Sequence, residues 1–344
     1  MHVVFRESHG LDETETPIDL GQAPADLVVL SFSDSDLGAF AAGWHRANGD
    51  LPSLRLATLA ALKHPLSVDT YIEQTLHGAK AILIRLIGGI SYWPYGIRQV
   101  QALAQEKGIA LAVLPADGRP DERLDAVSTL PVSTLHRLTQ LCDTGGAIAA
   151  QAALAQLALA AGLYARPVPG SKTLPDCGAW TPETGLCKAE HIRDTSKPLI
   201  ALTFYRAYVS AADTAPIEAM FAAFRTRGFD VIGLFAPSLK QPDSARWLAG
   251  QLRALGPAAI VNATAFSGKG DDGTSPLDAA GAPVFQIALA TSDEAKWAEA
   301  ERGLSPADLA MHVVLPEVDG RLFAGVASFK APEDRDPDLQ FARM

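Results

Sequence analysis

The chain has 344 residues, a length that predicts about two domains. Its composition, 48% hydrophobic and 20% charged, is ordinary for a globular protein and excludes an intrinsically disordered chain or a coiled coil. The formal net charge of −10, the pI of about 5.3 and the lack of a long basic run exclude a nucleic-acid-binding protein, which needs clustered lysine and arginine.

The cysteines and the apolar stretches indicate the compartment. The three cysteines, Cys142, Cys177 and Cys187, are an odd number and do not make a disulfide framework in a chain of this length. Residues 1–20 carry acidic residues where a signal peptide would be basic and then apolar, so we expect a cytoplasmic protein. Residues 147–165 are apolar but rich in alanine, which favours a helix of a soluble protein over a membrane span.

The first half of the chain alternates between short apolar runs and amphipathic segments. Strands are predicted at 26–31, 54–59, 81–87 and 109–114. Helices are predicted from Ser67, as N-cap, to Gly78 and over 97–107, which Gly108 ends. This alternation predicts a parallel sheet covered by helices on both faces, with its ligand crevice at the carboxyl ends of the strands. The loops that should share this edge are 31–36, 88–96 and 115–117.

The second half repeats the pattern after a stretch without periodicity. Residues 166–198 are rich in proline, glycine and threonine, which is typical of an irregular linker. Further strands are predicted at 199–204, 229–235, 258–262 and 283–289. By the same edge rule, the loops expected to lie together are 205–213, 262–273 and 316–320.

We therefore predict an α/β protein with two parallel-sheet, doubly wound domains of the flavodoxin-like or Rossmann-like kind. The N-terminal domain is expected at 1–145, and a connecting helix and irregular linker at 146–197. A second domain is expected at 198–344, and we expect it to be incomplete because the chain ends in a charged tail with no clear closing element.

An aromatic cluster follows two glycines in the stretch 86–96, LIGGISYWPYG. Gly88 and Gly89 let the backbone turn sharply, and Tyr92, Trp93 and Tyr95 offer flat, rigid surfaces with polar tips. These aromatics are either a platform for a large planar ligand or core side chains that close the end of the sheet. Residue types alone do not decide between the two.

The second domain offers its own candidates at the predicted ligand edge. Arg206 directly follows an apolar strand, where a guanidinium would suit a carboxylate-bearing ligand or form a structural salt bridge. Glu317 and Asp319 are two positions apart, so in an extended segment both carboxylates would face one side and could hold a divalent cation or accept protons. Spacing alone favours a solvated turn, and His312 is interpreted as a half-buried residue at a helix end.

Common nucleotide and hydrolase motifs are missing from the sequence. Gly268-Lys269-Gly270 lacks the spacing of a phosphate loop, and neither a Rossmann fingerprint, an HExxH motif nor a nucleophile elbow occurs, so ATP binding by this chain is not supported. Cys177, Cys187 and His191 are metal-capable residue types, but their spacing matches no common zinc site and a fourth ligand is missing, so we interpret the cysteines as packing residues.

Several longer strings resemble one family in the order in which they occur. They are IDLGQAPADLVVLS, PSLRLATLAALKHPLSVDTYIEQTLHGAKAILIRLIGGISYWPYG, FYRAYVSAADTAPIEAMFAAFRTRGFDV, AAIVNATAF and LPEVDGRLFAG. The chain resembles the N-terminal portion of the CobN-type large subunit of aerobic cobaltochelatase, which is related to the H subunit of magnesium chelatase. The resemblance covers nearly the whole chain.

The resemblance implies a function in cobalamin biosynthesis. The family inserts Co²⁺, a substrate, into hydrogenobyrinic acid a,c-diamide, and the macrocycle is held by the large subunit. ATP and Mg²⁺ would be used by two partner subunits, one an AAA+ ATPase, and not by this chain. By resemblance, Glu317 is the leading candidate for accepting pyrrolic protons and delivering the metal, followed by Asp319. The residues expected to hold the macrocycle or its arms are Tyr92, Trp93, Tyr95, Tyr205, Arg206, Asn262 and Thr264.

The chain departs from the family in length, because members are several times longer. We therefore expect these residues alone to be inactive in insertion. Two alternatives stay open: a fragment of a magnesium chelatase H-like subunit that binds protoporphyrin IX, and a non-enzymatic module whose two lobes close on a small molecule.

Overall fold

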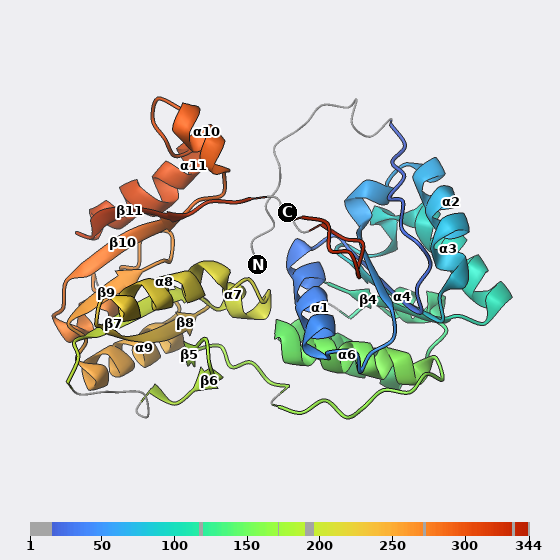
Figure 1. Ribbon diagram of the computed structural model, residues 1–344, viewed down its shortest axis with the longest axis horizontal. Helices are drawn as coiled ribbons and strands as arrows, with labels where there is room; N and C mark the ends of the chain where they lie inside the picture. Colours follow the sequence, from blue (N-terminus) through green and yellow to red (C-terminus); the bar gives the residue numbers. More distant parts are fainter. Residues whose placement is uncertain are drawn as a thin grey trace. The chain divides into compact units, whose positions relative to one another are not determined.

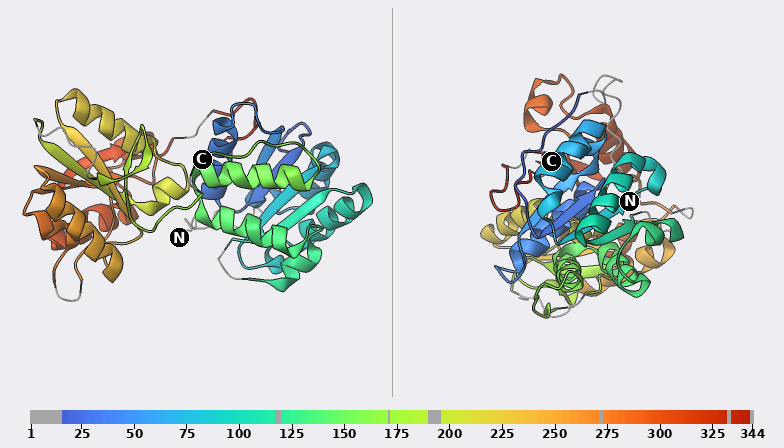
Figure 2. Two further views of the ribbon diagram at one scale, coloured as in Figure 1. Left: turned by 90° about the horizontal axis from the view of Figure 1, so that it is seen from below. Right: turned by 90° about the vertical axis from the view of Figure 1, so that its right-hand side faces the viewer.

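The computed structural model shows an α/β protein, as predicted (Figures 1 and 2). It describes residues 16–116, 120–170, 172–189, 196–270, 273–331 and 334–342. The chain divides into two compact units: unit 1 takes the described residues within 1–174, 210–212 and 332–344, and unit 2 takes those within 175–209 and 213–331.

Unit 1 is built on a four-stranded parallel sheet of order β2-β1-β3-β4. The strands are β1 (Leu27–Ser31), β2 (Leu54–Thr58), β3 (Ala81–Leu86) and β4 (Ala110–Pro115). Nearly every strand residue is buried, because helices cover both faces of the sheet. The strand order reverses between β1 and β3, as the predicted doubly wound topology requires.

Helices form one layer on each side of the unit 1 sheet. The core of one layer joins strand residues such as Val29 to α1 (Asp34–Arg46), α5 (Val132–Thr144) and α6 (Gly146–Ala160). The other core joins residues such as Val28 to α2 (Pro65–Gln74), α3 (Pro94–Lys107) and α4 (Glu122–Val127). Short 3₁₀ turns at Leu59–Leu62, Leu76–Gly78 and Ile90–Tyr92 complete the connections.

The helix that we expected to connect two domains instead packs inside unit 1. Helix α6 lies against α1, and its alanines and leucines form much of the core (Figure 1). Gly43 on α1 allows this approach: a Cβ there would lie 2.6 Å from the Gln151 nitrogen and 2.9 Å from the Ala147 oxygen. The small side chains of both helices therefore set their separation.

One predicted helix start is wrong by three residues, because the N-cap is His64 and not Ser67. Helix α2 begins at Pro65, because proline suits the first helical position and the His64 side chain accepts a hydrogen bond from the Leu66 amide. Ser67 lies inside the helix, where its hydroxyl accepts instead from the Ile18 amide at 2.7 Å. By contrast, Gly108 ends α3 in the left-handed conformation, as predicted. Ser33 caps α1, where its side chain accepts from the Asp36 amide.

The charged tail after unit 2 closes part of unit 1. Leu339 is fully buried in the same core as α1 and α6. The Gln22 side chain donates 2.9 Å hydrogen bonds both to the Leu56 carbonyl and to the Gln340 carbonyl, so the tail is tied beside β2. Residues 334–342 are thus a structural element of unit 1.

Unit 2 has a seven-stranded sheet of order β11-β10-β9-β7-β8-β5-β6. Five strands run parallel: β7 (Leu199–Tyr205), β8 (Asp230–Ala236), β9 (Ala259–Asn262), β10 (Val284–Leu289) and β11 (Leu322–Ser328). The hairpin β5 (Gly178–Thr181) and β6 (Gly185–Cys187) adds antiparallel to β8. The prediction of an irregular linker is therefore wrong for 178–187, and β11 is a strand that the sequence did not predict.

Helices α8 (Ala215–Thr226) and α9 (Pro242–Leu255) cover opposite faces of this sheet. On the α8 face, Phe221 contacts the ring of Trp180, and on the α9 face Leu248 and Leu252 join the core with Ala201. Shorter helical segments are α7 (Arg206–Ser210), η6 (Pro276–Ala280), α10 (Glu294–Glu299), α11 (Pro306–Leu309), the π-helical turn Ala310–Val314 and α12 (Leu315–Val318).

Candidate functional site

Three of the predicted segments meet in unit 2: the loops after β7 and β9 follow strand ends, as the edge rule predicts, whereas 317–321 precedes β11 and lies at the amino end of that strand. The hydroxyl of Tyr205, at the end of β7, donates to the Ala265 carbonyl at 2.7 Å. The hydroxyl of Ser267, in the loop after β9, donates to Asp319 at 2.7 Å. The segments 205, 262–268 and 317–321 therefore form one candidate site, which we call the unit 2 edge.

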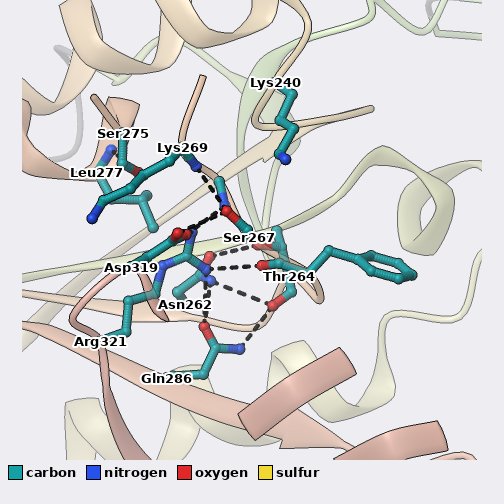
Figure 3. A network of polar contacts seen from close by, with 12 residues as sticks. Lys240, Asn262, Thr264, Ser267, Lys269, Ser275, Leu277, Gln286, Asp319 and Arg321 are labelled. Atoms are coloured by element: carbon teal, nitrogen blue, oxygen red, sulfur yellow. Dashed lines mark hydrogen bonds and ion pairs between the residues drawn. The ribbon is translucent and has the colours of Figure 1, made fainter. Parts of the chain in front are cut away.

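A buried polar network forms the floor of the unit 2 edge (Figure 3). The Asn262 Oδ1 accepts from the Thr203 and Thr264 hydroxyls at 2.6 and 3.0 Å, and its Nδ2 donates to Gln286 Oε1 at 2.7 Å. The Gln286 amide nitrogen in turn donates to the Thr264 carbonyl at 2.8 Å. All four residues are at most 1% exposed, so Asn262 and Thr264 hold the loop from below.

A buried ion pair fixes the loop above this floor. Asp319 accepts from Arg321 Nη2 at 2.8 Å, from the Ser267 hydroxyl at 2.7 Å and from the Gly268 amide at 2.6 Å (Figure 3). The side chains of Asp319 and Arg321 are 1% and 4% exposed, and burial lowers the pKa of Arg321 while Asp319 opposes that shift. A Cβ at Gly268 would lie 2.3 Å from Arg321 Nη2, so a larger residue there would push the guanidinium out of its ion pair with Asp319.

Glu317 and Asp319 do not face the same side, contrary to the extended geometry on which their pairing was predicted. A continuous helical run from Pro306 to Val318 contains Glu317, which is exposed, whereas Asp319 follows its end and turns inward. The helix turn separates residues two apart by about 200° around the axis, so the two carboxylates diverge. The only exposed acid of the pair is therefore Glu317.

Tyr205 and Arg206 both make contacts within unit 2. Burial raises the pKa of Tyr205 to about 12, so its hydroxyl stays protonated and donates to the Ala265 carbonyl. Arg206 Nε donates to the Pro175 carbonyl at 3.1 Å and lies 3.9 Å from the Asp176 carboxylate. Arg206 thus ties the start of the β5–β6 segment to the end of β7.

The three aromatics of unit 1 differ in exposure. Trp93 is 3% exposed and donates to the Leu62 carbonyl at 2.7 Å, so it is a core residue. The Tyr95 hydroxyl donates to the two Asp69 oxygens at 2.9 and 3.0 Å, and it is half-buried. Of the three, Tyr92 alone is largely exposed, at 66%.

Gly88 lies directly against the ring of Tyr92. Its φ of +78° lies in the region that favours glycine, and a Cβ there would lie 2.3 Å from Cε2 of the Tyr92 ring. The glycine therefore supplies both the turn and the space for the ring, which supports the prediction of a sharp turn before the aromatics.

Unit 1 also holds a charged cluster that the sequence did not identify. Arg85, 4% exposed in its side chain, donates to Asp36 at 3.1 Å, to Asp143 at 2.7 Å and to the Pro115 carbonyl at 3.2 Å. Burial raises the pKa of Asp36 although Arg85 opposes it. The sequence does contain a signal for this cluster, because Arg85 is the single charged residue in the otherwise apolar strand AILIRL and a buried arginine needs acidic partners. These contacts unite the loops after β1 and β4, while Asp117 lies outside the described residues.

The cysteine prediction is only partly covered by the structure. Cys142, Cys177 and Cys187 are free and half-buried, and burial raises the pKa of all three thiols, that of Cys142 to about 12. His191 lies outside the described residues. Within the described ranges, no group of three or more His, Cys, Asp or Glu residues could hold a metal ion, and no helix there is long and apolar enough to cross a membrane.

A cavity of 260 Å³ lies beside the Asp319–Arg321 pair. Its lining includes Ser275, Leu277, Asp278, Val284, Asp319 and Arg321. Ligand pockets for drug-sized molecules span roughly 300–1,000 Å³, so this cavity would admit a substituent but not a whole macrocycle. A large ligand at the unit 2 edge would have to lie on its surface.

Comparison with known proteins identifies the family. The CobN/Magnesium Chelatase family model matches residues 140–343. CobN subunits of aerobic cobaltochelatase from a Sinorhizobium species and from Pseudomonas aeruginosa are each 35% identical, over 99% and 96% of this chain but only 28% and 27% of their own length. The magnesium chelatase H protein from Cereibacter sphaeroides is 33% identical over 38% of this chain and 12% of its own length.

A solved structure agrees with these sequence matches. The catalytic subunit of cobaltochelatase from Mycobacterium tuberculosis superimposes with a TM-score of 0.68 at 25% identity, over 91% of this chain and 25% of that one. The chain thus spans a little over a quarter of the curated relatives that it matches over nearly its whole length.

Proposed function

Because the chain belongs to the CobN/magnesium chelatase family, as a CobN-type chelatase subunit, we propose that it helps to hold hydrogenobyrinic acid a,c-diamide while Co²⁺ is inserted. The observation that carries the residue assignment is the exposed Glu317 in the last turn of a helical run, directly before the buried Asp319–Arg321 pair. The insertion reaction is proposed for the assembled enzyme, since these residues correspond to 28% of a curated relative.

The reaction needs a cation delivered and one proton removed from the corrin-type macrocycle. The free macrocycle carries one acidic proton on its inner nitrogens; Co²⁺ enters, four metal–nitrogen bonds form, and one N–H bond breaks. The proton must pass to a base as the metal exchanges its water ligands for nitrogen. A carboxylate can do both parts of this work, because it binds divalent cations through oxygen and accepts protons.

Glu317 is the acid that we assign to this step. It is exposed, so it can meet hydrated Co²⁺ and a proton from the macrocycle without a conformational change. Asp319 has three donors around its carboxylate and a side chain that is only 1% exposed, so we assign it a positioning role. Of the seven predicted macrocycle-binding residues, Tyr92 remains the best exposed, whereas the buried Asn262 and Thr264 support the loop.

ATP hydrolysis is assigned to partner subunits, one of them an AAA+ ATPase. The sequence of this chain contains no phosphate loop, which supports that division. We place the reaction in the cytoplasm, because the free thiols of Cys142, Cys177 and Cys187 suit a reducing compartment.

A second candidate is a magnesium chelatase H-like protein that binds protoporphyrin IX. It is favoured by the 33% identity to the Cereibacter sphaeroides protein, but that match covers only 38% of the chain. A binding module without enzymatic partners has less support, since both longer matches are to cobaltochelatase subunits.

The assignment of Glu317 is tested by cobalt insertion in the reconstituted complex. Glu317→Gln should lower the turnover number by about 100-fold or more, as expected for loss of a general base, while macrocycle affinity changes little. Glu299→Gln, a change of another exposed glutamate in unit 2, is the matched control and should leave turnover unchanged. Equal turnover of the Glu317 variant and the wild type would remove Glu317 from the reaction.

A further inference from the structure

Phe266 adopts a backbone conformation that a bulky side chain normally avoids. Its φ is +66°, in the left-handed region where glycine is at home, and its side chain is 39% exposed. Bulky residues persist there only when the surrounding structure enforces the conformation, and such positions cluster at binding sites. The position therefore needs an explanation.

The surrounding contacts hold this conformation from several sides. The Phe266 amide donates to the Met311 carbonyl at 2.7 Å, in the π-helical turn, and its own carbonyl accepts from Arg321 at 3.4 Å. On either side, the Ala265 carbonyl accepts from Tyr205 and the Gly268 amide donates to Asp319. Three segments of unit 2 thus fix one short turn: the end of β7, the π-helical turn and residues 319–321.

The result is a rigid presentation of an aromatic ring at the carboxyl edge of the sheet. A glycine would take this φ without strain, so what phenylalanine adds at the position is its ring. The Met311 contact also connects the turn to the helical run that carries Glu317 six residues later. The nearby cavity of 260 Å³ is too small for a macrocycle, which leaves the exposed surface as the place for a flat ligand.

We propose that Phe266 is a macrocycle-binding residue whose ring packs against the flat face of the tetrapyrrole-derived substrate. Aromatic side chains bind such faces well because they offer a rigid apolar surface with little rotamer freedom to lose. The assignment rests on the proposed function and adds to it a specific contact residue in unit 2.

Four variants separate the ring from the backbone. In the complete native polypeptide, Phe266→Ala and Phe266→Gly both remove the ring, but only glycine also relieves the positive φ. Phe266→Tyr keeps the aromatic ring. Phe285→Ala, which removes a phenylalanine ring of similar exposure at 36% from β10, is the matched control.

The measurements are the affinity for hydrogenobyrinic acid a,c-diamide by absorbance titration and the melting temperature. Phe266→Ala and Phe266→Gly should both weaken binding by about tenfold, while Phe266→Tyr and Phe285→Ala stay within about threefold of the wild type. The glycine variant should melt at a higher temperature than the alanine variant, because its backbone is unstrained.

The outcomes distinguish the residue from the function. If the wild type binds the macrocycle and the glycine variant binds it equally well, Phe266 is not a contact and this proposal alone fails. If Phe266→Gly has both a higher melting temperature and a higher macrocycle affinity than Phe266→Ala, the substitutions weaken binding only by destabilising the fold, and the proposal is likewise wrong. If the wild type binds no macrocycle at all, the proposed function fails together with it.

Discussion

Removal of the Asp319 carboxylate should unfold the unit 2 edge while leaving unit 1 intact. In Asp319→Ala, Arg321 keeps its charge in a site where its side chain is only 4% exposed, and the Ser267 hydroxyl and Gly268 amide lose their shared acceptor. Loss of one partner of a buried ion pair costs about 3–5 kcal/mol, because the remaining charge stays desolvated and unpaired. We expect a loss of that size in the free energy of unfolding of unit 2.

The second residue of the pair provides an internal test of this reasoning. If the cost comes from the stranded charge, Asp319→Ala combined with Arg321→Met should recover at least about half of the loss, since apolar replacement of both partners of a buried pair is often close to neutral. Glu317→Ala, two positions away but exposed, is the matched control and should change stability by less than about 0.5 kcal/mol.

Hydrogen exchange read peptide by peptide measures the effect without assuming that the two units unfold together. The amides of β9 and β10 should lose protection in Asp319→Ala, and those of β1 and β3 should keep it. If Asp319→Ala lowers the free energy of unfolding of unit 2 by less than about 1 kcal/mol, or if the double variant recovers none of the loss, the buried ion pair does not stabilise the unit 2 edge as argued.

Three further outcomes follow from burial and charge. Trp93→Ala should destabilise unit 1 by about 3–5 kcal/mol in chemical denaturation, whereas Tyr92→Ala should cost much less because that ring is 66% exposed; equal costs would contradict the core assignment of Trp93. Leu339→Ala should cost unit 1 about 2–5 kcal/mol although it follows unit 2 in the chain, and an unchanged denaturation curve would show that the tail is not part of that core. Burial lowers the pKa of His312 below its usual 6.5. As the pH falls from 6.5 toward the folded-state pKa, the unfolded state binds more protons than the folded state, so unit 2 should lose stability in this range, and His312→Gln should flatten the loss. If the stability of the wild type changes with pH equally steeply at pH 7.5 and at pH 5.5, this account of His312 is wrong.

The fold was predictable where one local signal decided the outcome. The short, continuous apolar runs of β1 and β3 are typical of strands that are covered on both faces. The Ser33 hydroxyl can accept a hydrogen bond at a helix start, and Gly108 can take the left-handed conformation at a helix end, so both residue types mark helix ends. The hairpin β5–β6 was missed because each strand is short, with four and three residues, and gains its stability from pairing with β8. No local pattern reports a pairing partner more than 40 residues away.

The site was predictable as a location but not in the roles of its residues. The loop after Asn262 does meet the 316–320 turn, as predicted, but that turn precedes β11 and does not follow a strand end, as the edge rule assumed. The burial of Asn262 depends on Gln286, 24 positions later in the chain. The pairing of Glu317 with Asp319 assumed an extended segment, whereas Pro316 continues a helical run. Side-chain direction follows from such tertiary detail, which spacing in the sequence does not contain.

The most direct test of the central claim is an absorbance titration of the complete native polypeptide with hydrogenobyrinic acid a,c-diamide, with protoporphyrin IX titrated in parallel. A CobN-type subunit should bind the first compound saturably and more tightly than the second. Preference for protoporphyrin IX would favour the magnesium chelatase H-like alternative, and failure to bind either compound would contradict the chelatase assignment.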